Sequence, residues 1–196
     1  VEKMQSTQAM RAIAEHSDKT YTLLYTKHTT LKIGMFALER MVQVMEMTQA
    51  AMVYADHYQQ IDGVQKTAPV IDYQPGSLRD DFNFGSVLLF NANAFKEVIE
   101  NTEEEYQYAG LYDLRLKISQ KSKLVHINEY LYTEVESDKR KSGEKQFDYV
   151  DPKNRQVQIE MEQACTNHLQ EIGGYLYPIF RPVDFSSHTF EYDASV

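Results

Sequence analysis

Lys27 and His28 are the first residues along the chain whose side chains and position could contact a ligand. They directly follow a short apolar run, YTLLY at 21–25, which gives way to polar residues from Thr26 onward. A short run of β-forming residues with polar flanks predicts a buried strand. Ligands of α/β proteins bind beyond the carboxyl ends of strands. We therefore predict that Lys27 and His28 bind substrate, and likewise Asp56, where a second apolar run at 50–58 becomes polar.

Four further charged residues are candidates for substrate binding: Arg79, Asp80, Asp81 and Arg140. Arginine matches the geometry of phosphate, and Lys27 could hold a diphosphate in place of a metal ion. Consecutive residues of a strand point to opposite faces, so Asp80 and Asp81 need a loop to bring their carboxylates together. The alternative interpretation is that these side chains are solvated and hold no ligand.

The sequence lacks the other common active-site patterns. Its six histidines form no His-x-x-x-His pair and no cluster with cysteine or acidic residues at the spacing of metal ligands, so we predict no metal site. It contains no Gly-x-Ser-x-Gly elbow, phosphate-binding P-loop or dinucleotide fingerprint. The single cysteine, Cys165, permits no internal disulfide and is expected to be a buried, inert thiol. Ordinary hydrolases, kinases and dehydrogenases are therefore unsupported.

The overall charge is acidic, with 29 Asp and Glu residues against 20 Lys and Arg residues and a net charge of −9. This balance argues against nucleic acid as a partner, because such binding depends on neutralising phosphates. No apolar stretch approaches the roughly 18 residues of a membrane helix, and no signal-peptide pattern is present. We expect a cytoplasmic protein without a membrane span.

Apolar periodicity predicts an alternation of helices and strands. Helices are expected at 6–16, with Ser6 as N-cap, at 34–49, at 91–101, with Asn91 or Asn93 as cap, and at 111–121. Strands are expected at 21–25, 50–58 and 84–90, and a strand or hairpin at 124–135, whereas 59–81 is expected to be a loop with a turn at Asp62-Gly63. This order predicts an α/β fold with a mixed, mostly parallel sheet and helices on both faces.

The chain is expected to divide into a core at 1–150 and a C-terminal part at 151–196. The C-terminal part begins with a long helix, for which Asp151 suits the N-cap, Pro152 the first position and Gly173-Gly174 the end. An extended aromatic tail follows, which we expect to wrap the core. Because the sequence starts at Val1 without methionine and ends in a strand-like run, we expect a fragment of a longer protein.

Several segments in order resemble the family 2 glycosyltransferases, which are inverting enzymes with the GT-A fold. They are YTLLYTKHTTLKIGMFALERMVQVMEMTQAAMVYADHY, GSVLLFNANAF, AGLYDLRLKIS and INEYLYTEVESDKRKSG, which together span about residues 6–145. The resemblance implies a GT-A-like core that transfers a sugar from a nucleotide-sugar donor to a hydroxyl of a glycan acceptor. It also implies Mg²⁺ or Mn²⁺ as a cofactor if the domain is active; no other cofactor is indicated.

The two acidic motifs of the family are not preserved here. The position of its Asp-x-Asp motif, which holds the metal ion, falls on 25–28, where neither lysine nor a lone histidine suits a hard cation. Its Glu-Asp pair falls on Gly110 and Leu111, and leucine cannot act as the general base, a role worth roughly 10²- to 10⁴-fold in rate. Asp113 matches the family's second Asp and is the candidate catalytic residue, although it lies about 200° further around the helix.

The resemblance also suggests how the chain fits into a larger protein. The family's opening strand has no counterpart before residue 6, so the core is expected to be incomplete at its N-terminus, while FEYDASV at the end resembles the lead-in to such a strand. We expect the first, degenerate unit of a bacterial two-unit protein of polysaccharide biosynthesis, with the following transferase domain as a partner. The domain is then a pseudoenzyme, or weakly active, that helps to position a sugar.

A second hypothesis is a non-catalytic interaction or carbohydrate-binding module that docks a neighbouring transferase domain. Its binding surface would be rich in tyrosine, which stacks on sugar rings or on a partner protein. The tyrosines concerned are Tyr73, Tyr106, Tyr108 and Tyr112.

Overall fold

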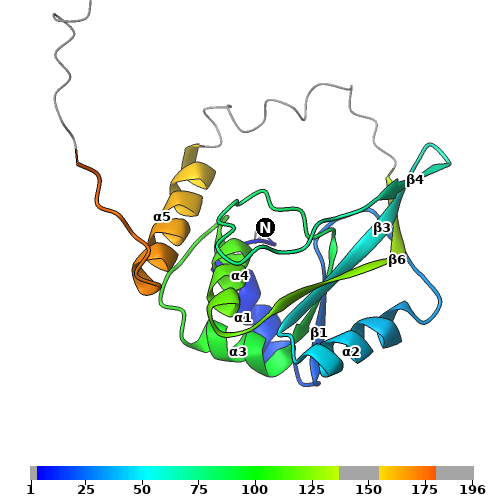
Figure 1. Cartoon of the computed structure of the whole chain (residues 1–196), viewed down its shortest axis with the longest axis horizontal. Helices are drawn as coiled ribbons and strands as arrows, with labels where there is room; N and C mark the ends of the chain where they lie inside the picture. Colours follow the sequence, from blue (N-terminus) through cyan, green and yellow to red (C-terminus); the bar gives the residue numbers. More distant parts are fainter. Residues whose placement is uncertain (1–3, 137–154, 180–196) are drawn as a thin grey trace, which may run out of the picture.

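The computed structural model describes residues 4–136 and 155–179 of the chain, with helices and strands following one another along the sequence (Figure 1). The elements are α1 (Thr7–His16), β1 (Tyr21–Tyr25), β2 (Thr30–Ile33), α2 (Ala37–Thr48), β3 (Met52–Ile61), β4 (Val64–Ala68), β5 (Val87–Asn91), α3 (Ala92–Glu100), α4 (Gly110–Lys121), β6 (Leu124–Glu136) and α5 (Arg155–Glu171). The α/β class predicted from the sequence is confirmed.

The sheet is mixed, with strands in the order β1-β5-β3-β6-β2. Strand β4 pairs with the C-terminal half of β3. Among these pairings β3–β6 is parallel, whereas β1–β5, β3–β5, β3–β4 and β2–β6 are antiparallel. The expectation of a mostly parallel sheet was therefore wrong. The physical reason is that β5 enters in the reverse direction between β1 and β3, and a tight turn at Asp62-Gly63 folds β4 back on β3.

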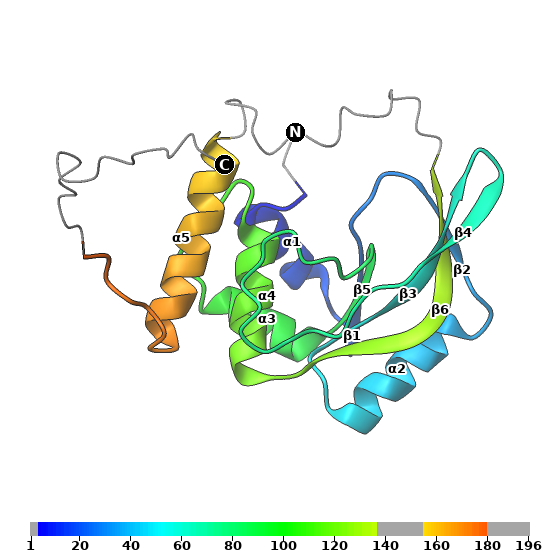
Figure 2. The same ribbon diagram turned by 45° about the horizontal axis from the view of Figure 1, so that its top comes forward.

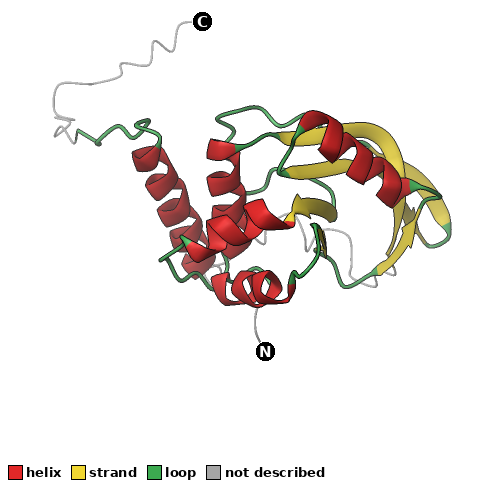
Figure 3. Cartoon of the chain, turned by 90° about the horizontal axis from the view of Figure 1, so that it is seen from below, coloured by secondary structure: helices red, strands yellow, loops and turns green. Residues whose placement is uncertain are grey.

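Helices cover both faces of the sheet, as predicted. On one face, α1, α3 and α4 bury Met10, Phe95 and Leu114 against Tyr54 and Phe90 of the strands. On the other face, α2 buries its own apolar stripe against the alternate strand residues, namely Ala37, Met41 and Met45 against Val53, Ala55, Val87, Leu89 and Ile127. Figure 2 shows α2 on the side of the sheet away from α1, α3 and α4, and Figure 3 shows the same layers from below. The methionines of α2 that face the sheet are core residues.

Local signals at the ends of elements fall where the sequence predicts them. The Ser6 hydroxyl accepts a hydrogen bond from the backbone N–H of Ala9 at 3.1 Å, and the Asn91 side chain caps α3 in the same way. The turn at Asp62-Gly63 is confirmed, but the expected loop at 59–81 contains the end of β3 and all of β4. Strand β2 lies in a stretch for which the sequence analysis predicts no strand.

Helix α5 packs along α4, and Figure 1 shows the two lying side by side. Ala164 of α5 is buried with Tyr106, Tyr112 and Leu116 in a small core of their own. The expected start of this helix at Asp151 and Pro152 lies outside the described residues. Beyond its end at Glu171, residues 175–179 are largely exposed, so this part of the expected wrapping tail does not cover the core. None of the helices in residues 4–136 and 155–179 has the length and apolar character needed to cross a bilayer.

The packing of α5 on α4 predicts a pH dependence of stability. His168 of α5 is buried beside Gln120 of α4, and this burial lowers the pKa of His168 below its ordinary value. Below about pH 6.5 the unfolded chain therefore binds more protons at this residue than the folded chain, so its contribution to stability is lost as the pH falls through that value. Urea unfolding at about pH 7.5 and pH 5.5 should show a smaller pH dependence in His168→Gln than in the wild type; an identical dependence contradicts this assignment.

Candidate functional site

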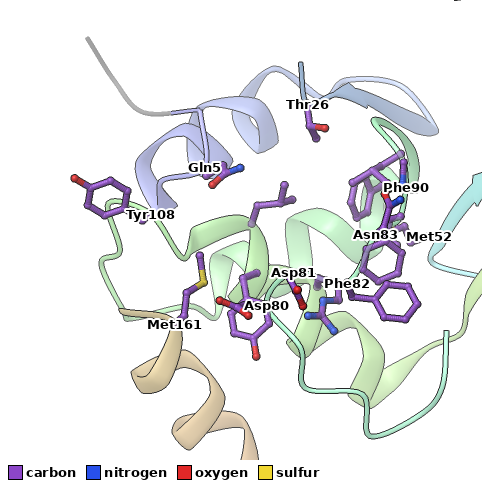
Figure 4. Close-up of a pocket in the computed structure, with 16 residues that line it drawn as sticks. Gln5, Thr26, Met52, Asp80, Asp81, Phe82, Asn83, Phe90, Tyr108 and Met161 are labelled. Atoms are coloured by element: carbon purple, nitrogen blue, oxygen red, sulfur yellow. Dashed lines mark hydrogen bonds between the residues drawn. The ribbon is translucent and has the colours of Figure 1, made fainter. Parts of the chain in front are cut away.

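A pocket of about 350 Å³ opens between the start of α1, the end of β1, the loop at 80–85, α4 and α5 (Figure 4). Its volume is at the small end of the roughly 300–1,000 Å³ typical of ligand sites. Aromatic rings and polar side chains share its walls. The lining residues are Gln5, Thr26, Met52, Asp80, Asp81, Phe82, Asn83, Phe84, Gly85, Leu88, Phe90, Tyr108, Leu111, Tyr112, Arg115 and Met161.

Thr26 and Leu111, which come from distant parts of the chain, meet at this pocket. Thr26 directly follows β1 and its backbone N–H donates to the Ser86 carbonyl at 2.9 Å. Leu111 lies in the first turn of α4, where its backbone N–H donates to the Gln5 carbonyl at 3.2 Å. In the family resemblance, Thr26 falls within the segment 25–28 that corresponds to the metal-binding Asp-x-Asp motif. Leu111 falls at the position of the general base. The pocket is therefore lined by one residue from the segment 25–28, which offers a hydroxyl, and by Leu111, which offers an alkyl chain.

The start of α4 is tightly fitted against α1 at Gly110. A Cβ atom added to Gly110 would lie 2.3 Å from the backbone nitrogen of Thr7 and 2.4 Å from the carbonyl carbon of Ser6. The buried carboxylate of Glu160, on α5, accepts hydrogen bonds from the backbone N–H groups of Tyr108 at 2.7 Å and Ala109 at 3.4 Å. An acid at a helix N-terminus stabilises the helix through its unpaired N–H groups and its dipole. Three helices thus fix the position of Leu111.

Two side chains of α4 hold the loop that carries the acidic residues. The Arg115 guanidinium donates to the carbonyls of Ser77 at 3.1 Å and Arg79 at 2.8 Å, and the Tyr112 hydroxyl donates to the carbonyl between them, that of Leu78. Three consecutive carbonyls are therefore bound from one helix. This arrangement sets the position of the residues that follow, Asp80 and Asp81.

Asp80 and Asp81 both line the pocket, and Figure 4 shows their carboxylates among its lining side chains. The Arg79 guanidinium forms two hydrogen bonds to Asp81, each of 2.8 Å, and this interaction lowers the pKa of the Asp81 carboxyl. Both partners are exposed, so the pair contributes little to stability. The two acids lie in a loop, as their joint use would require, and Arg79 adjoins the pocket through its bond to Asp81.

Lys27 and His28 do not line the pocket. Lys27 forms an ion pair with Glu134 of β6, a carboxylate that is fully buried and also lies 3.4 Å from Nε2 of His57. His28 is exposed. Because consecutive residues of an extended chain point in opposite directions, Thr26 faces the pocket and Lys27 faces away from it.

Asp56 lies outside the pocket lining and is buried, with 1 % of its surface exposed. Its Oδ1 accepts a hydrogen bond from the backbone N–H of Val70 at 2.8 Å and lies 2.9 Å from Nε2 of His126. The other ring nitrogen of His126 lies 2.8 Å from Oδ1 of Asp72. Asp56 therefore joins β3 to the loop after β4 and to β6, a connection within the fold.

Asp113, the candidate catalytic residue, is also outside the pocket lining. It is 3 % exposed, and its Oδ2 lies 2.9 Å from Nζ of Lys117, which also pairs with Glu104 at 2.8 Å. Burial raises the pKa of the Asp113 carboxyl, while Lys117 acts in the opposite direction. The structure thus brings together Asp80 and Asp81 among the predicted site residues, and leaves Lys27, His28, Asp56 and Asp113 elsewhere. Arg140 lies outside the described residues.

Sequence reasoning missed Arg115 and the aromatic residues Phe82 and Phe84. Arg115 interrupts the apolar pair Leu114 and Leu116 within a helix, and a charged residue flanked in this way is the signal that could have identified it. Of the tyrosines assigned to a binding surface, Tyr106 and Tyr112 are buried, at 6 % and 7 % exposure. That expectation was wrong for these two residues because both belong to the core between α4 and α5.

Side chains that could hold a metal ion are scattered over residues 4–136 and 155–179. Within these ranges no group of three or more His, Cys, Asp or Glu side chains is arranged to hold one. Asp80 and Asp81 are acids that line the pocket, and Asp81 is already engaged by Arg79, while Glu134 pairs with Lys27 within the segment implied by the resemblance. Mg²⁺ and Mn²⁺ thus stay predictions of the resemblance, with no ligand set assigned to them.

Relationships to known proteins supply no assignment for this site. Neither the protein-family models nor the curated protein sequences with which the chain was compared include a match.

Proposed function

We propose that this domain is a family 2 glycosyltransferase-like unit of a glycan-assembly protein that binds and positions a sugar without transferring it. The observation that carries the proposal is the meeting of Thr26 and Leu111 at one pocket. The resemblance assigns metal binding to the segment 25–28, to which Thr26 belongs, and proton abstraction to Leu111, and these functions belong together in one active site. A shared pocket is what a GT-A-like core requires of them.

The lining of the pocket suits a sugar ring. Sugars present apolar C–H faces that pack on aromatic rings, and hydroxyl groups that donate to carboxylates and amides. Phe82 and Phe84 supply rings, while Asp80 and Asn83 supply acceptors. With about 350 Å³ the pocket is small for a whole nucleotide-sugar, and we propose that it takes one sugar unit.

Transfer by this pocket is not expected, because neither motif position carries an acid. The Leu111 side chain cannot accept the proton of an acceptor hydroxyl, and the loss of a general base alone lowers a rate by roughly 10²- to 10⁴-fold. Asp113 does not replace it, since its carboxylate contacts Lys117 and does not line the pocket. Chemistry on the bound sugar is therefore assigned to a neighbouring unit.

The test combines ligand-induced stabilisation with an activity assay. Thermal unfolding of the chain is measured with neutral and acidic monosaccharides and their oligomers, and with nucleotide diphosphates and nucleotide-sugars in the presence of Mn²⁺. A sugar at 100 times its dissociation constant adds about 2.7 kcal/mol of stability. We expect stabilisation by a sugar and no detectable transfer or hydrolysis of nucleotide-sugars.

A matched pair of variants locates the binding. Phe82→Ala removes a ring from the pocket and should abolish the stabilisation by sugar, whereas Phe36→Ala removes a ring that is 70 % exposed at the start of α2 and should leave it intact. Stabilisation by nucleotide diphosphate and Mn²⁺ together with measurable transfer would contradict the non-catalytic assignment. No stabilisation by any sugar would contradict sugar binding itself.

A further inference from the structure

Arg115 is a buried cation on the wall of the pocket. It is 5 % exposed, and its guanidinium carbon lies 4.8 Å from the ring centre of Tyr112, 5.4 Å from that of Phe84 and 5.8 Å from that of Tyr73. Its hydrogen bonds to the carbonyls of Ser77 and Arg79 engage neutral groups. Within residues 4–136 and 155–179, no carboxylate forms an ion pair with it. Burying an arginine without a carboxylate partner is unfavourable, and arginine is seldom buried unless it is paired.

The guanidinium group of Arg115 has N–H donors that could bind a ligand. A guanidinium has five N–H donors in a plane; the Ser77 and Arg79 carbonyls each engage a donor on one terminal nitrogen, and the Tyr73 hydroxyl is a third partner, so the five donors outnumber these three partners. Planar, bidentate recognition of carboxylates is the interaction for which this geometry is suited. An anionic group entering the pocket would supply the counter-charge that the surrounding rings and carbonyls do not.

The other charges of the pocket limit what that anionic group can be. Asp81 is compensated by Arg79, whereas Asp80 lies at the exposed side of the lining and acts electrostatically on Arg115. The pocket is therefore positive at its buried wall and negative towards solvent. A ligand with one carboxylate and several hydroxyls fits this polarity, because the hydroxyls can donate to Asp80. A diphosphate would bring several negative charges close to the acids.

We propose that the sugar bound by this pocket carries a single carboxylate, as hexuronic acids do, and that Arg115 binds this carboxylate. The inference rests on the proposed function, of which it specifies the ligand class. Asp80 then accepts hydrogen bonds from the hydroxyl groups, the Asn83 amide donates to them or accepts from them, and Phe82 and Phe84 contact the apolar face of the ring.

The experiment compares glucuronic acid with two neutral analogues, glucose and the methyl ester of glucuronic acid, by isothermal titration of the full chain. An added hydrogen-bonded charge contact predicts roughly 10-fold tighter binding of glucuronate than of either analogue. The difference should shrink at high salt, because the screened interaction is between charges. Uridine diphosphate serves as the alternative anion and is expected to bind more weakly than glucuronate.

Two variants separate ligand recognition from the structural role of Arg115 in holding the loop. Arg115→Met should reduce the preference for glucuronate over glucose to about one-fold, whereas Tyr112→Phe, which removes the hydroxyl that bonds the Leu78 carbonyl and Cys165 and leaves Arg115 in place, should keep the preference. A purely structural arginine would weaken both sugars equally and leave the ratio unchanged, which overturns the proposal.

The comparison with the methyl ester uses the wild-type protein, so it tests recognition of the carboxylate even if Arg115→Met fails to fold. Equal binding of glucuronate, its ester and glucose overturns this inference and leaves the proposed sugar site standing. Tighter binding of uridine diphosphate than of glucuronate also overturns it. Binding of no sugar at all overturns the proposed function and this inference together.

Discussion

Replacing Lys27 with methionine is expected to lower the free energy of unfolding by about 3 kcal/mol and to leave sugar binding unchanged. Lys27 is the cation paired with Glu134, whose side chain is 1 % exposed and has no access to water. Removing one partner of such a pair leaves an uncompensated buried charge, which costs roughly 3–5 kcal/mol. The lower end applies because Lys27 is itself 35 % exposed and His57 stays near the carboxylate. Urea unfolding of both proteins measures the difference.

A double-mutant cycle provides the control for this result. Glu134→Leu alone removes the charge that needs a partner, and Lys27→Met together with Glu134→Leu should recover most of the stability lost in Lys27→Met. If Lys27→Met instead folds with wild-type stability and loses binding of nucleotide diphosphates, the lysine acts on a ligand. That outcome would restore the prediction that Lys27 substitutes for a metal ion.

Gly110→Ala is expected to lower the free energy of unfolding by about 3 kcal/mol, although alanine normally favours a helix over glycine by about 1 kcal/mol. The added Cβ would lie 2.3 Å from the backbone nitrogen of Thr7 and within 2.8 Å of its Cα, so the beginnings of α1 and α4 must move apart. Backbone atoms cannot rotate out of the way as a side chain can. Because Leu111 and Gln5 both line the pocket, the same change should weaken sugar binding.

Gly63→Ala is a matched comparison in which no atom lies within 4 Å of the added Cβ. Gly63 has a φ of 80°, so alanine there costs about 1–2 kcal/mol of backbone strain without any contact, and it should leave the pocket unaffected. Urea unfolding and sugar titration of the two variants separate the cost of losing a glycine from the cost of separating the helices. A Gly110→Ala protein as stable as the wild type would mean that α1 and α4 do not approach this closely.

The elements that could be predicted from the sequence are those defined by neighbouring residues. Strand β1 has the predicted bounds of Tyr21 and Tyr25, and Ser6 and Asn91 cap helices as expected. Apolar periodicity and capping act over a few residues, so a local pattern contains the information. Strand β2 was missed because its residues are mostly exposed and show no buried alternation.

The direction and order of strands depend on contacts between distant segments, and here the prediction was wrong. The alternation of helices and strands suggested neighbouring parallel strands, yet β5 separates β1 from β3. No residue near β1 specifies that Val87–Asn91 will pair with it in the reverse direction. This pairing is decided by the packing of helices on both faces of the sheet.

The part of the candidate site that could be predicted from the sequence is the acidic loop that contains Asp80 and Asp81. Asp80 and Asp81 were candidate binding residues that needed a loop to bring them together, and both lie in a loop and line the pocket. Lys27 adjoins Thr26 in sequence but faces a buried glutamate 107 residues away, which no local pattern reveals. Arg115 belongs to the site because Ser77 and Arg79 present carbonyls to it, and that contact likewise exists only in the folded chain.

The capping of α4 by Glu160 bears on the order in which the protein takes shape during its synthesis. The start of α4 is held by Gln5, about a hundred residues upstream, and by Glu160, 52 residues downstream of Tyr108. As the chain leaves the ribosome, strands and helices up to α4 can assemble before Glu160 has emerged. The amide groups of Tyr108 and Ala109 stay without this acceptor until α5 has formed, so the pocket is completed only after most of the domain has been translated.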